Sequence, residues 1–299
     1  MNKRVIILGS GGYIGSWLLK RFLSEKNCEV VGLSSRECDL LSLSSVTSAL
    51  SDLNRNDVVI VTAAITRLKE NTYNSLVKNV QMAENLGVVM AKRLAGQVIY
   101  LSSIDVYGSL EKNFKAKDIA LTESSELNPD DYYGISKAAG EMLLKKCAGE
   151  TDTPLTILRL PGVYGPGDNN AGTIFKLMSQ IAERGKVEIY GDGQDRRYYL
   201  YIDDLYRVIA EAIQERSNTV LNIVNDENVS ILEIVEYIQS AVKRKCELIF
   251  RPVAESGRER IRHMTIDNTK LHKVLPQVIL TELPQGISLY SEYLACHKS

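Results

Sequence analysis

Cysteine is scarce in this chain and follows no pattern. The five cysteines are an odd number, none forms a Cys-x-x-Cys pair, and no histidine-rich spacing accompanies them. This argues against a disulfide framework and against a zinc site. We therefore expect reduced thiols and no bound metal.

Long hydrophobic runs are missing as well. No stretch approaches the roughly 18 consecutive apolar residues of a membrane-spanning helix. Lys3 and Arg4 precede only a short apolar run, which is too short for a signal peptide. We expect a cytoplasmic protein with no membrane partner.

Neither sign of charge is in excess. The chain has 36 basic and 37 acidic residues, dispersed along its length, and a net charge of -1. It therefore offers no basic field that would hold nucleic acid. This balance favours a small-molecule partner.

The chain does contain a regular alternation of short apolar runs and helical stretches. Its 299 residues, 44% of them hydrophobic, suffice for a large core. Buried parallel strands are expected at 5–8, 30–33, 58–61, 98–101, 155–160 and 221–224. Helices are expected at 14–24, 45–52, 74–94 and 134–148. This order predicts an α/β fold with a doubly wound parallel sheet, as in Rossmann folds.

The alternation becomes irregular after residue 160, where the chain reads Pro-Gly-Val-Tyr-Gly-Pro-Gly-Asp. We expect one domain over 1–165 and 195–235 and a smaller α/β lobe over 166–194 and 236–299. Ligands of doubly wound sheets bind beyond the carboxyl ends of the strands, so the lobe would cover that crevice.

A glycine-rich loop follows the first predicted strand. Gly9, Gly12 and Gly15 are spaced as in loops that bind a dinucleotide pyrophosphate. Glycine permits a sharp turn, a close approach of backbone N–H groups to phosphate, and a helix start near the sheet. Glycine clusters also form ordinary strand-to-helix turns, so the rest of the chain decides between these interpretations.

Tyr133 and Lys137 lie four residues apart at the start of a predicted helix, on one helical face. A nearby cation favours the phenolate and lowers a phenol pKa from about 10 toward neutrality. The alternative is an exposed tyrosine with a solvated lysine. Ser102 and Ser103 directly follow the predicted strand at 98–101. A hydroxyl at this position either binds a substrate oxygen or begins a turn.

In this order, these motifs resemble the extended short-chain dehydrogenase/reductase family. The matching segments are Gly9-x-x-Gly12-x-x-Gly15, Ser102-Ser103-Ile-Asp-Val-Tyr-Gly108, Tyr133-x-x-x-Lys137, Arg159-x-x-x-Val-Tyr-Gly-Pro166, Gly191-Asp-Gly-Gln-Asp-Arg-Arg197 and Tyr201-Ile-Asp-Asp204. Within this family the chain is similar to NAD-dependent epimerases, dehydratases and 4-keto-reductases of nucleotide sugars. The resemblance implies that the smaller lobe binds a nucleotide sugar, and it suggests polysaccharide biosynthesis.

The resemblance implies roles for individual residues. Ser103 would polarise the substrate, Tyr133 would be the acid/base, and Lys137 would hold the nicotinamide ribose. Further matches are Asn79 below the active site, Arg197 on the substrate diphosphate, and Arg258 or Arg260 as a second clamp. Asn79 also fits an ordinary helix residue, and Arg258 and Arg260 also fit a solvated surface. The implied cofactor contacts are Gly9, Gly12, Tyr13, Ile14, Gly15, Ser34, Ser35, Arg36, Asp39, Ala63, Ala64 and Lys137.

The end of the second strand bears on the choice of cofactor. Ser34, Ser35 and Arg36 stand where an acidic residue would bind a free ribose 2′-hydroxyl. This favours NADP(H), with NAD(H) as the alternative, since Arg36 could also stack on adenine or face water. Asp39 follows in a segment that resembles the adenine-side loop of sugar-nucleotide reductases.

These features favour reduction of a nucleotide-linked 4-keto-6-deoxyhexose. The alternatives are a C4 epimerase, a 4,6-dehydratase and a catalytically idle dinucleotide-binding scaffold. Asp105 matches a catalytic glutamate of some dehydratases, although Ile104 replaces the neighbouring acid and Asp105 also fits a turn residue. Gly162 departs from the asparagine that relatives commonly have. The resemblance also implies a homodimer through helices 74–94 and 134–148.

Overall fold

The main sheet has six strands, and every neighbouring pair is parallel. The computed structural model describes residues 3–108, 120–168, 172–253 and 264–297. The strand order is β10-β5-β4-β3-β1-β2. The strands are β1 (Arg4–Leu8), β2 (Glu29–Leu33), β3 (Asp57–Val61), β4 (Gln97–Ser103), β5 (Leu155–Leu160) and β10 (Thr219–Asn222). The order reverses between β1 and β3, which places a ligand crevice at their carboxyl ends.

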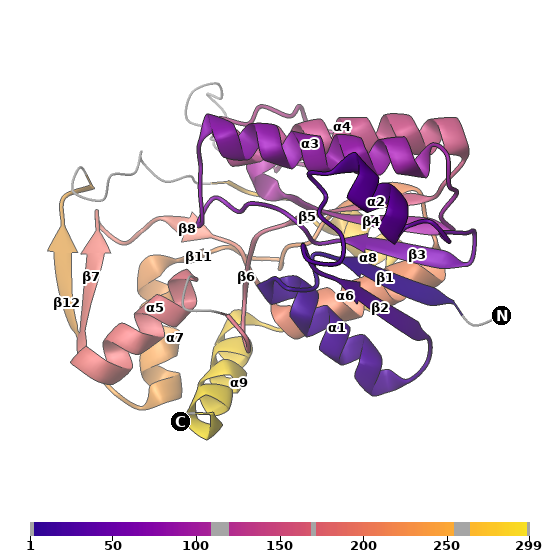
Figure 1. Ribbon diagram of the computed structural model, residues 1–299. Helices are drawn as coiled ribbons and strands as arrows, with labels where there is room; N and C mark the ends of the chain where they lie inside the picture. The colour runs from indigo at the N-terminus through magenta and orange to yellow at the C-terminus, as the bar shows by residue number, and fades with distance from the viewer. Residues whose placement is uncertain (1–2, 109–119, 169–171, 254–263, 298–299) are drawn as a thin grey trace.

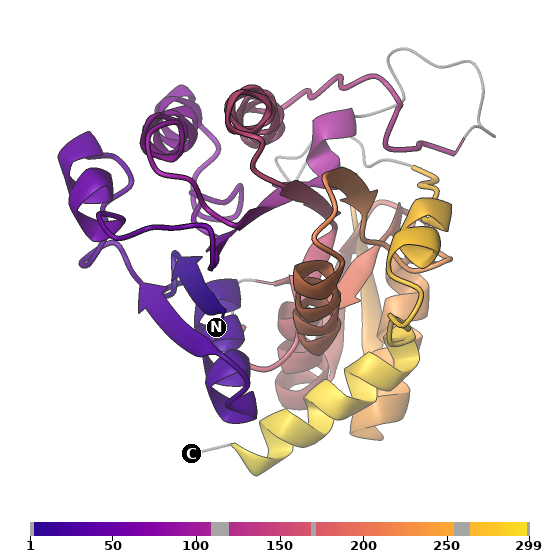
Figure 2. The ribbon, with the colours of Figure 1, turned by 90° about the vertical axis from the view of Figure 1, so that its right-hand side faces the viewer.

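Helices cover both faces of this sheet (Figures 1 and 2). They are α1 (Tyr13–Glu25), α2 (Leu43–Ala49), α3 (Tyr73–Met90), α4 (Tyr132–Thr151), α6 (Ile202–Glu215) and α8 (Thr269–Val274). Side chains of β1 alternate between the two faces: Val5 and Ile7 pack with α1 and α6, whereas Ile6 and Leu8 pack on the side of α2 and α3. The predicted doubly wound α/β fold is confirmed.

A smaller part of the molecule lies to the left in Figure 1. It contains β6 (Gly162–Tyr164), α5 (Thr173–Ser179), a π-helical turn η3 (Gln180–Arg184), β7 (Lys186–Tyr190), β8 (Arg196–Arg197), β9 (Tyr199–Tyr201), β11 (Val229–Ser230), α7 (Ile231–Val242), β12 (Glu247–Arg251) and α9 (Leu283–Cys296). These elements form paired strands β6–β9, β7–β12 and β8–β11. Ile174, Val187, Ile234 and Ile287 belong to their shared core.

The smaller part is attached where ligands of the main sheet bind. β5 leads directly into β6, and the Tyr13 hydroxyl, at the start of α1, donates to the carbonyl of Gly165 at 3.2 Å. The C-terminal segment contributes to both cores, since Leu271 packs under the main sheet and Tyr290 packs in the smaller part. The two sets of domain boundaries stay a prediction.

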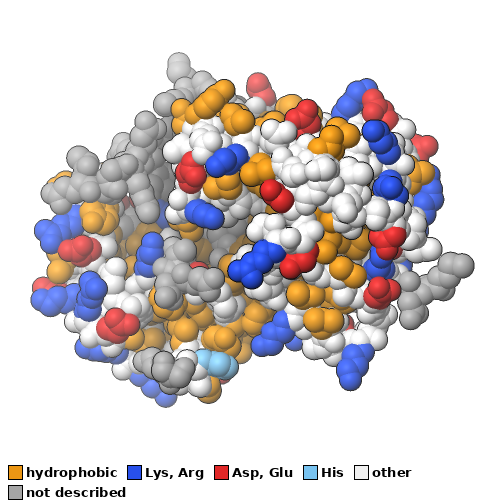
Figure 3. All heavy atoms as spheres, viewed as in Figure 1, with side chains coloured by type: hydrophobic (Ala, Val, Ile, Leu, Met, Phe, Trp, Pro, Cys, Tyr) orange, Lys and Arg blue, Asp and Glu red, His pale blue; other side chains and the backbone are white. Residues whose placement is uncertain are grey.

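Other expectations concern surface and composition. In the described part of the chain, no helix is long and apolar enough to span a bilayer, and no cluster of three or more His, Cys, Asp or Glu could hold a metal. All five cysteines are unpaired. On the face in Figure 3, basic and acidic side chains are interspersed.

Candidate functional site

The glycine loop brings α1 against the ends of two strands. A Cβ on Gly15 would lie 2.2 Å from the carbonyl oxygen of Gly9, and Gly9, with φ of +90°, would place a Cβ 2.8 Å from the backbone of Ala63. Gly12 is exposed and begins α1 without a side-chain cap. The first N–H groups of an α-helix have no acceptor within the helix, so those of Tyr13 and Ile14 suit a phosphate, as at other helix N-termini that bind anions. The loop fits a dinucleotide pyrophosphate.

An acidic residue lies at the end of β2, although the sequence analysis finds none there. The Glu37 carboxylate accepts the backbone N–H of Ser34 at 2.9 Å and also accepts its hydroxyl. These hydrogen bonds lower the pKa of Glu37. The turn brings Glu37 back because its N–H donates to the carbonyl of Ser34. Ser35, Arg36 and Asp39 are exposed, and Asp39 bonds the N–H of Leu41.

The candidate catalytic residues meet at the carboxyl end of β4. Ser103 is the last residue of β4 and begins a short 3₁₀ turn, η1 (Ile104–Tyr107). The start of α4 packs directly on this turn, since a Cβ on Gly134 would lie 2.5 Å from the carbonyl oxygen of Asp105. Tyr133 therefore lies beside η1. The Lys137 ammonium is 5.8 Å from the centre of the Tyr133 ring.

The environment of Lys137 is buried and mostly apolar. Its ammonium donates to the carbonyl of Leu101 at 2.6 Å and lies 4.8 Å from the centre of the Tyr100 ring. Burial lowers the pKa of Lys137 to about 8, against the opposing negative charge of Glu141. The lysine is thus held behind the candidate acid/base rather than in solvent.

The expectation that Lys137 lowers the pKa of Tyr133 stays a prediction. Burial raises the pKa of Tyr133 well above its ordinary value, and the negative charge of Asp105 raises it further. The positive charge of Arg67 opposes this rise. The Lys137 ammonium is directed at the Leu101 carbonyl. Burial and the charge of Asp105 thus favour the protonated form of the phenol.

Asp105 connects Ser103 to Arg67. The Ser103 hydroxyl donates to Asp105 Oδ2 at 3.1 Å, and the N–H of Asp105 donates back to Ser103 Oγ at 3.1 Å. The other carboxylate oxygen, Oδ1, lies 3.1 Å from Arg67 Nη1. Asp105 therefore has a turn contact and an ion pair at once. None of the sequence motifs includes Arg67, which lies in a loop without periodic spacing.

The buried Asn79, on α3, braces the same loop. Its Oδ1 accepts the N–H of Ile65 at 2.8 Å, and its Nδ2 donates to the carbonyl of Ile65 and to Ser136 Oγ on α4. Asn71, at the end of the loop, accepts the backbone N–H of Tyr133 at 3.1 Å. These contacts fix the loop between α3 and α4. Asn71 is a second residue that the motifs did not indicate.

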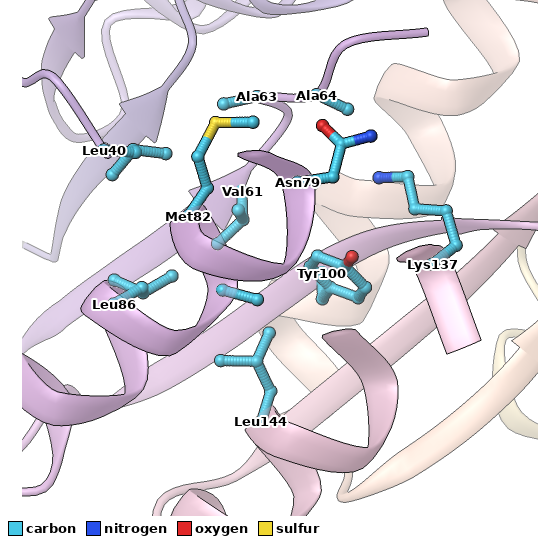
Figure 4. A pocket seen from close by; sticks show the side chains of 11 residues that line it. Leu40, Val61, Ala63, Ala64, Asn79, Met82, Leu86, Tyr100, Lys137 and Leu144 are labelled. Carbon is cyan, nitrogen blue, oxygen red and sulfur yellow. The ribbon is translucent and has the colours of Figure 1, made fainter. Parts of the chain in front are cut away.

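A small cavity lies beneath the loop (Figure 4). Its volume is about 10 Å³, close to the space that one water molecule needs. Asn79 and Lys137 point into it, and Ala63 and Ala64 lie at its upper edge. The lining residues are Leu40, Val61, Ala63, Ala64, Asn79, Met82, Ala83, Leu86, Tyr100, Lys137 and Leu144. The expected cofactor contacts after β3 therefore adjoin the lysine.

Ser102, next to Ser103, has a different environment. Its hydroxyl donates at 2.6 Å to Glu141, which is buried together with Arg159 in an ion pair of 2.8 Å. Arg159 also donates to the hydroxyl of Tyr107 at 2.8 Å. This network ties α4 to β4, β5 and η1. Only Ser103 of the two serines faces the candidate site.

Two neighbouring arginines on β8 also differ. Arg196 donates to Asn228 at 2.7 Å and pairs with Glu233 at 3.1 Å. The Nε of Arg197 is buried and has no hydrogen-bond partner within the described residues, which suits a guanidinium that awaits an anion. Arg258 and Arg260 lie outside the described residues.

Comparisons with known proteins agree with this fold. The sequence profile of the NAD dependent epimerase/dehydratase family matches residues 5–224. The uncharacterized UDP-glucose epimerase YtcB of Bacillus subtilis is 26% identical over 274 residues, covering 83% of this chain and 84% of the relative. A dTDP-4-dehydro-6-deoxy-D-allose reductase of a Streptomyces species is 26% identical over 270 residues, covering 81% and 82%.

Among solved structures, the UDP-glucose 4-epimerase of Thermotoga maritima with UDP-glucose has a TM-score of 0.84 at 22% identity. The match covers 99% of this chain and 100% of that chain. Other matched relatives are named as a dehydratase and a decarboxylase. The relatives are thus nucleotide-sugar enzymes with several different reactions.

Proposed function

The chain belongs to the NAD dependent epimerase/dehydratase family, and from this premise we propose that it reduces a nucleotide-linked 4-keto-6-deoxyhexose with NADPH. One observation carries the choice of reaction: Asp105 is engaged by Arg67 and Ser103, while Tyr133 stands beside it as a protonated phenol. Reduction of a ketone needs one proton donor, whereas loss of water needs a further acid/base group.

The residues of the chain have distinct parts in this proposal. The nicotinamide, when bound, supplies the hydride. Tyr133 gives its proton to the carbonyl oxygen, and burial and Asp105 favour the protonated form from which it starts. Ser103 hydrogen-bonds the same oxygen. Asn79 fixes the loop at the base of the site through its hydrogen bonds to Ile65. Lys137 would bind the nicotinamide ribose.

The cofactor is assigned to the crevice between the glycine loop and the loop after β3. Gly9, Gly12 and Gly15 form the pyrophosphate site at the start of α1. Ser35 and Arg36 are exposed at the end of β2, where they can contact a 2′-phosphate. Support for the nucleotide-sugar site in the smaller part comes from Arg197.

A second candidate is a C4 epimerase with retained NAD. The observation that favours it is Glu37, since a carboxylate at the end of β2 suits a free ribose 2′-hydroxyl and opposes a 2′-phosphate. An epimerase returns the hydride to the same substrate and consumes no cofactor. One of the relatives is named as an epimerase, which supports this alternative.

The deciding experiment is the absorbance of NADPH, with NADH in parallel, after mixing with a panel of nucleotide-linked 4-keto-6-deoxy sugars. Stoichiometric oxidation of NADPH supports the reductase. No oxidation, together with NAD bound to the isolated protein, supports the epimerase. The matched control is Tyr133→Phe, which should bind NADPH normally and lose turnover by about 10²- to 10⁴-fold.

We also propose that the enzyme is a cytoplasmic homodimer that pairs through α3 and α4. Exposed apolar side chains lie on both helices, including Val77 and Val88 on α3 and Ile135 and Met142 on α4. Met142→Glu should therefore give a monomer in light scattering. Leu23→Glu, an equally exposed leucine on α1, is the control. A monomeric parent protein at micromolar concentration would contradict the dimer.

A further inference from the structure

We propose that Arg67 is a positioning residue of the candidate active site: it holds the Asp105 carboxylate against Ser103 and shields the Tyr133 hydroxyl from it. The inference rests on the proposed function, because it assigns Arg67 a part in proton transfer through Tyr133. None of the motifs includes Arg67.

The contacts of Arg67 join two elements that carry the candidate catalytic residues. Its Nη1 lies 3.1 Å from Asp105 Oδ1, on η1, and 3.9 Å from Asp131 Oδ2, at the start of α4. The second oxygen of Asp105 accepts the Ser103 hydroxyl at 3.1 Å. One guanidinium therefore holds the turn that presents Ser103 and the helix start that presents Tyr133.

The loop that carries Arg67 is anchored on both sides of it. Asn79 binds both the N–H and the carbonyl of Ile65, and Asn71 accepts the N–H of Tyr133. Arg67 itself remains about half exposed, with 49% of its side chain accessible. It is thus fixed at its backbone and open toward the solvent side of the site.

Tyr133 is surrounded by groups of both signs from four elements. The negative charges of Asp105 on η1 and of Asp131 at the N-terminal cap of α4 raise the pKa of Tyr133, and the positive charge of Arg67 in the loop after β3 lowers it. Tyr100 on β4 also neighbours Tyr133. Lys137, on α4, is turned to the Leu101 carbonyl. Arg67 lies 3.1 Å and 3.9 Å from the carboxylates of Asp105 and Asp131 and therefore offsets their charge, which otherwise favours the protonated phenol.

This arrangement makes opposite predictions for the two partners. In oxidation of the alcohol by NADP⁺, Tyr133 must accept a proton, so the rate at fixed pH follows the phenolate fraction. Arg67→Gln should lower kcat/KM of oxidation about tenfold, and Asp105→Asn should raise it about tenfold, since one pKa unit corresponds to a tenfold change. The double variant should lie near the parent.

A purely structural ion pair predicts something else. Both single variants would then lose activity, with no change in the pH profile, and this result would overturn the inference. Lys69→Gln removes a positive charge from the same loop, where the side chain is exposed, and should leave the profile unchanged. Arg67→Lys keeps the positive charge and should retain most of the parent pH profile. This variant keeps the inference testable if Arg67→Gln fails to fold.

A second measurement needs no sugar substrate. In protein labelled with ¹³C at tyrosine Cζ, the Tyr133 signal is assigned by its loss in Tyr133→Phe. We expect ionisation to begin at a lower pH than in the parent in Asp105→Asn and at a higher pH in Arg67→Gln, whereas an unchanged onset in Arg67→Gln would overturn the inference. If the parent turns over no 4-keto sugar, the proposed function fails while this titration still tests Arg67.

Discussion

Two ion pairs lie at α4: Arg159–Glu141 within the core and Arg67–Asp105 near the start of the helix. They differ in burial and in the number of their partners. Arg159 and Glu141 are fully buried, and their remaining polar atoms bond Ser102 and Tyr107. Arg67 is half exposed, and its partner Asp105 is largely buried. A buried pair with satisfied partners fixes a scaffold, because breaking it strands a charge. A pair whose cation is half exposed to solvent contributes less stability and is suited to adjusting a neighbouring group.

The largest effect is expected from breaking the buried pair. Arg159→Met should reduce the free energy of unfolding by about 3–5 kcal/mol, because Glu141 is left buried without its cation. Denaturant unfolding followed by circular dichroism measures this loss. Glu141→Leu combined with Arg159→Met is the matched control, and it should recover much of the stability. A loss below about 1 kcal/mol in the single variant would show that water reaches Glu141.

The two adjacent serines separate the scaffold from the site. Ser102→Ala removes a hydrogen bond to a buried carboxylate and should cost about 1–3 kcal/mol of unfolding free energy with the chemistry intact. Ser103→Ala should leave stability nearly unchanged and lower kcat. Unfolding curves and turnover of both variants test the contrast. Equal effects of the two substitutions on kcat would contradict it.

The Arg159–Glu141 pair should also make the free energy of unfolding depend on pH in the acid range. Burial alone would raise the pKa of Glu141, but the hydrogen bonds and charge of Arg159 outweigh it, and the pKa is lowered from 4.5. A carboxylate whose pKa is lower in the folded than in the unfolded state stabilises the fold at pH values above its unfolded-state pKa. This stabilisation is lost as the pH falls through the folded-state pKa. We expect stability to fall below about pH 4.5, and less steeply in Glu141→Gln. Unfolding at several pH values between 3 and 7, roughly the range in which carboxylates titrate, measures this.

The smallest change in stability is expected at the exposed pair. Arg67→Gln should alter the free energy of unfolding by about 0–1 kcal/mol, because solvent screens a half-exposed guanidinium. Its effect should appear in the pH profile instead. A loss of several kcal/mol in thermal or denaturant unfolding would place this pair with the buried one and remove the contrast.

The fold was largely predictable because buried parallel strands are short continuous apolar runs. Residues 58–61 and 155–160 both lie in strands of the main sheet. Boundaries were less accurate: α3 ends at Met90, four residues before the predicted end, and β10 begins at Thr219, two residues early. Helix ends depend on caps and on pairing with neighbours, which local patterns report poorly.

The candidate site was predictable where fixed spacing defines it. Tyr133 and Lys137 share a helical face, so their proximity follows from sequence distance. Arg67 and Asp105 are 38 positions apart, and only the folded loop brings them together. Glu37 was missed for a related reason, because a turn returns its carboxylate to Ser34. Roles of these residues in catalysis stay a prediction.

The glycine loop has a consequence for how the sequence can evolve. The Cβ that Gly15 lacks would meet the carbonyl of Gly9, and the Cβ that Gly9 lacks would meet the backbone of Ala63. Both obstacles are main-chain atoms, which every residue type possesses. No second substitution elsewhere can remove them, so neither glycine has a suppressor. Gly9 and Gly15 are therefore not expected to be replaced by successive single substitutions, whereas exposed positions of the loop after β3 can change one at a time.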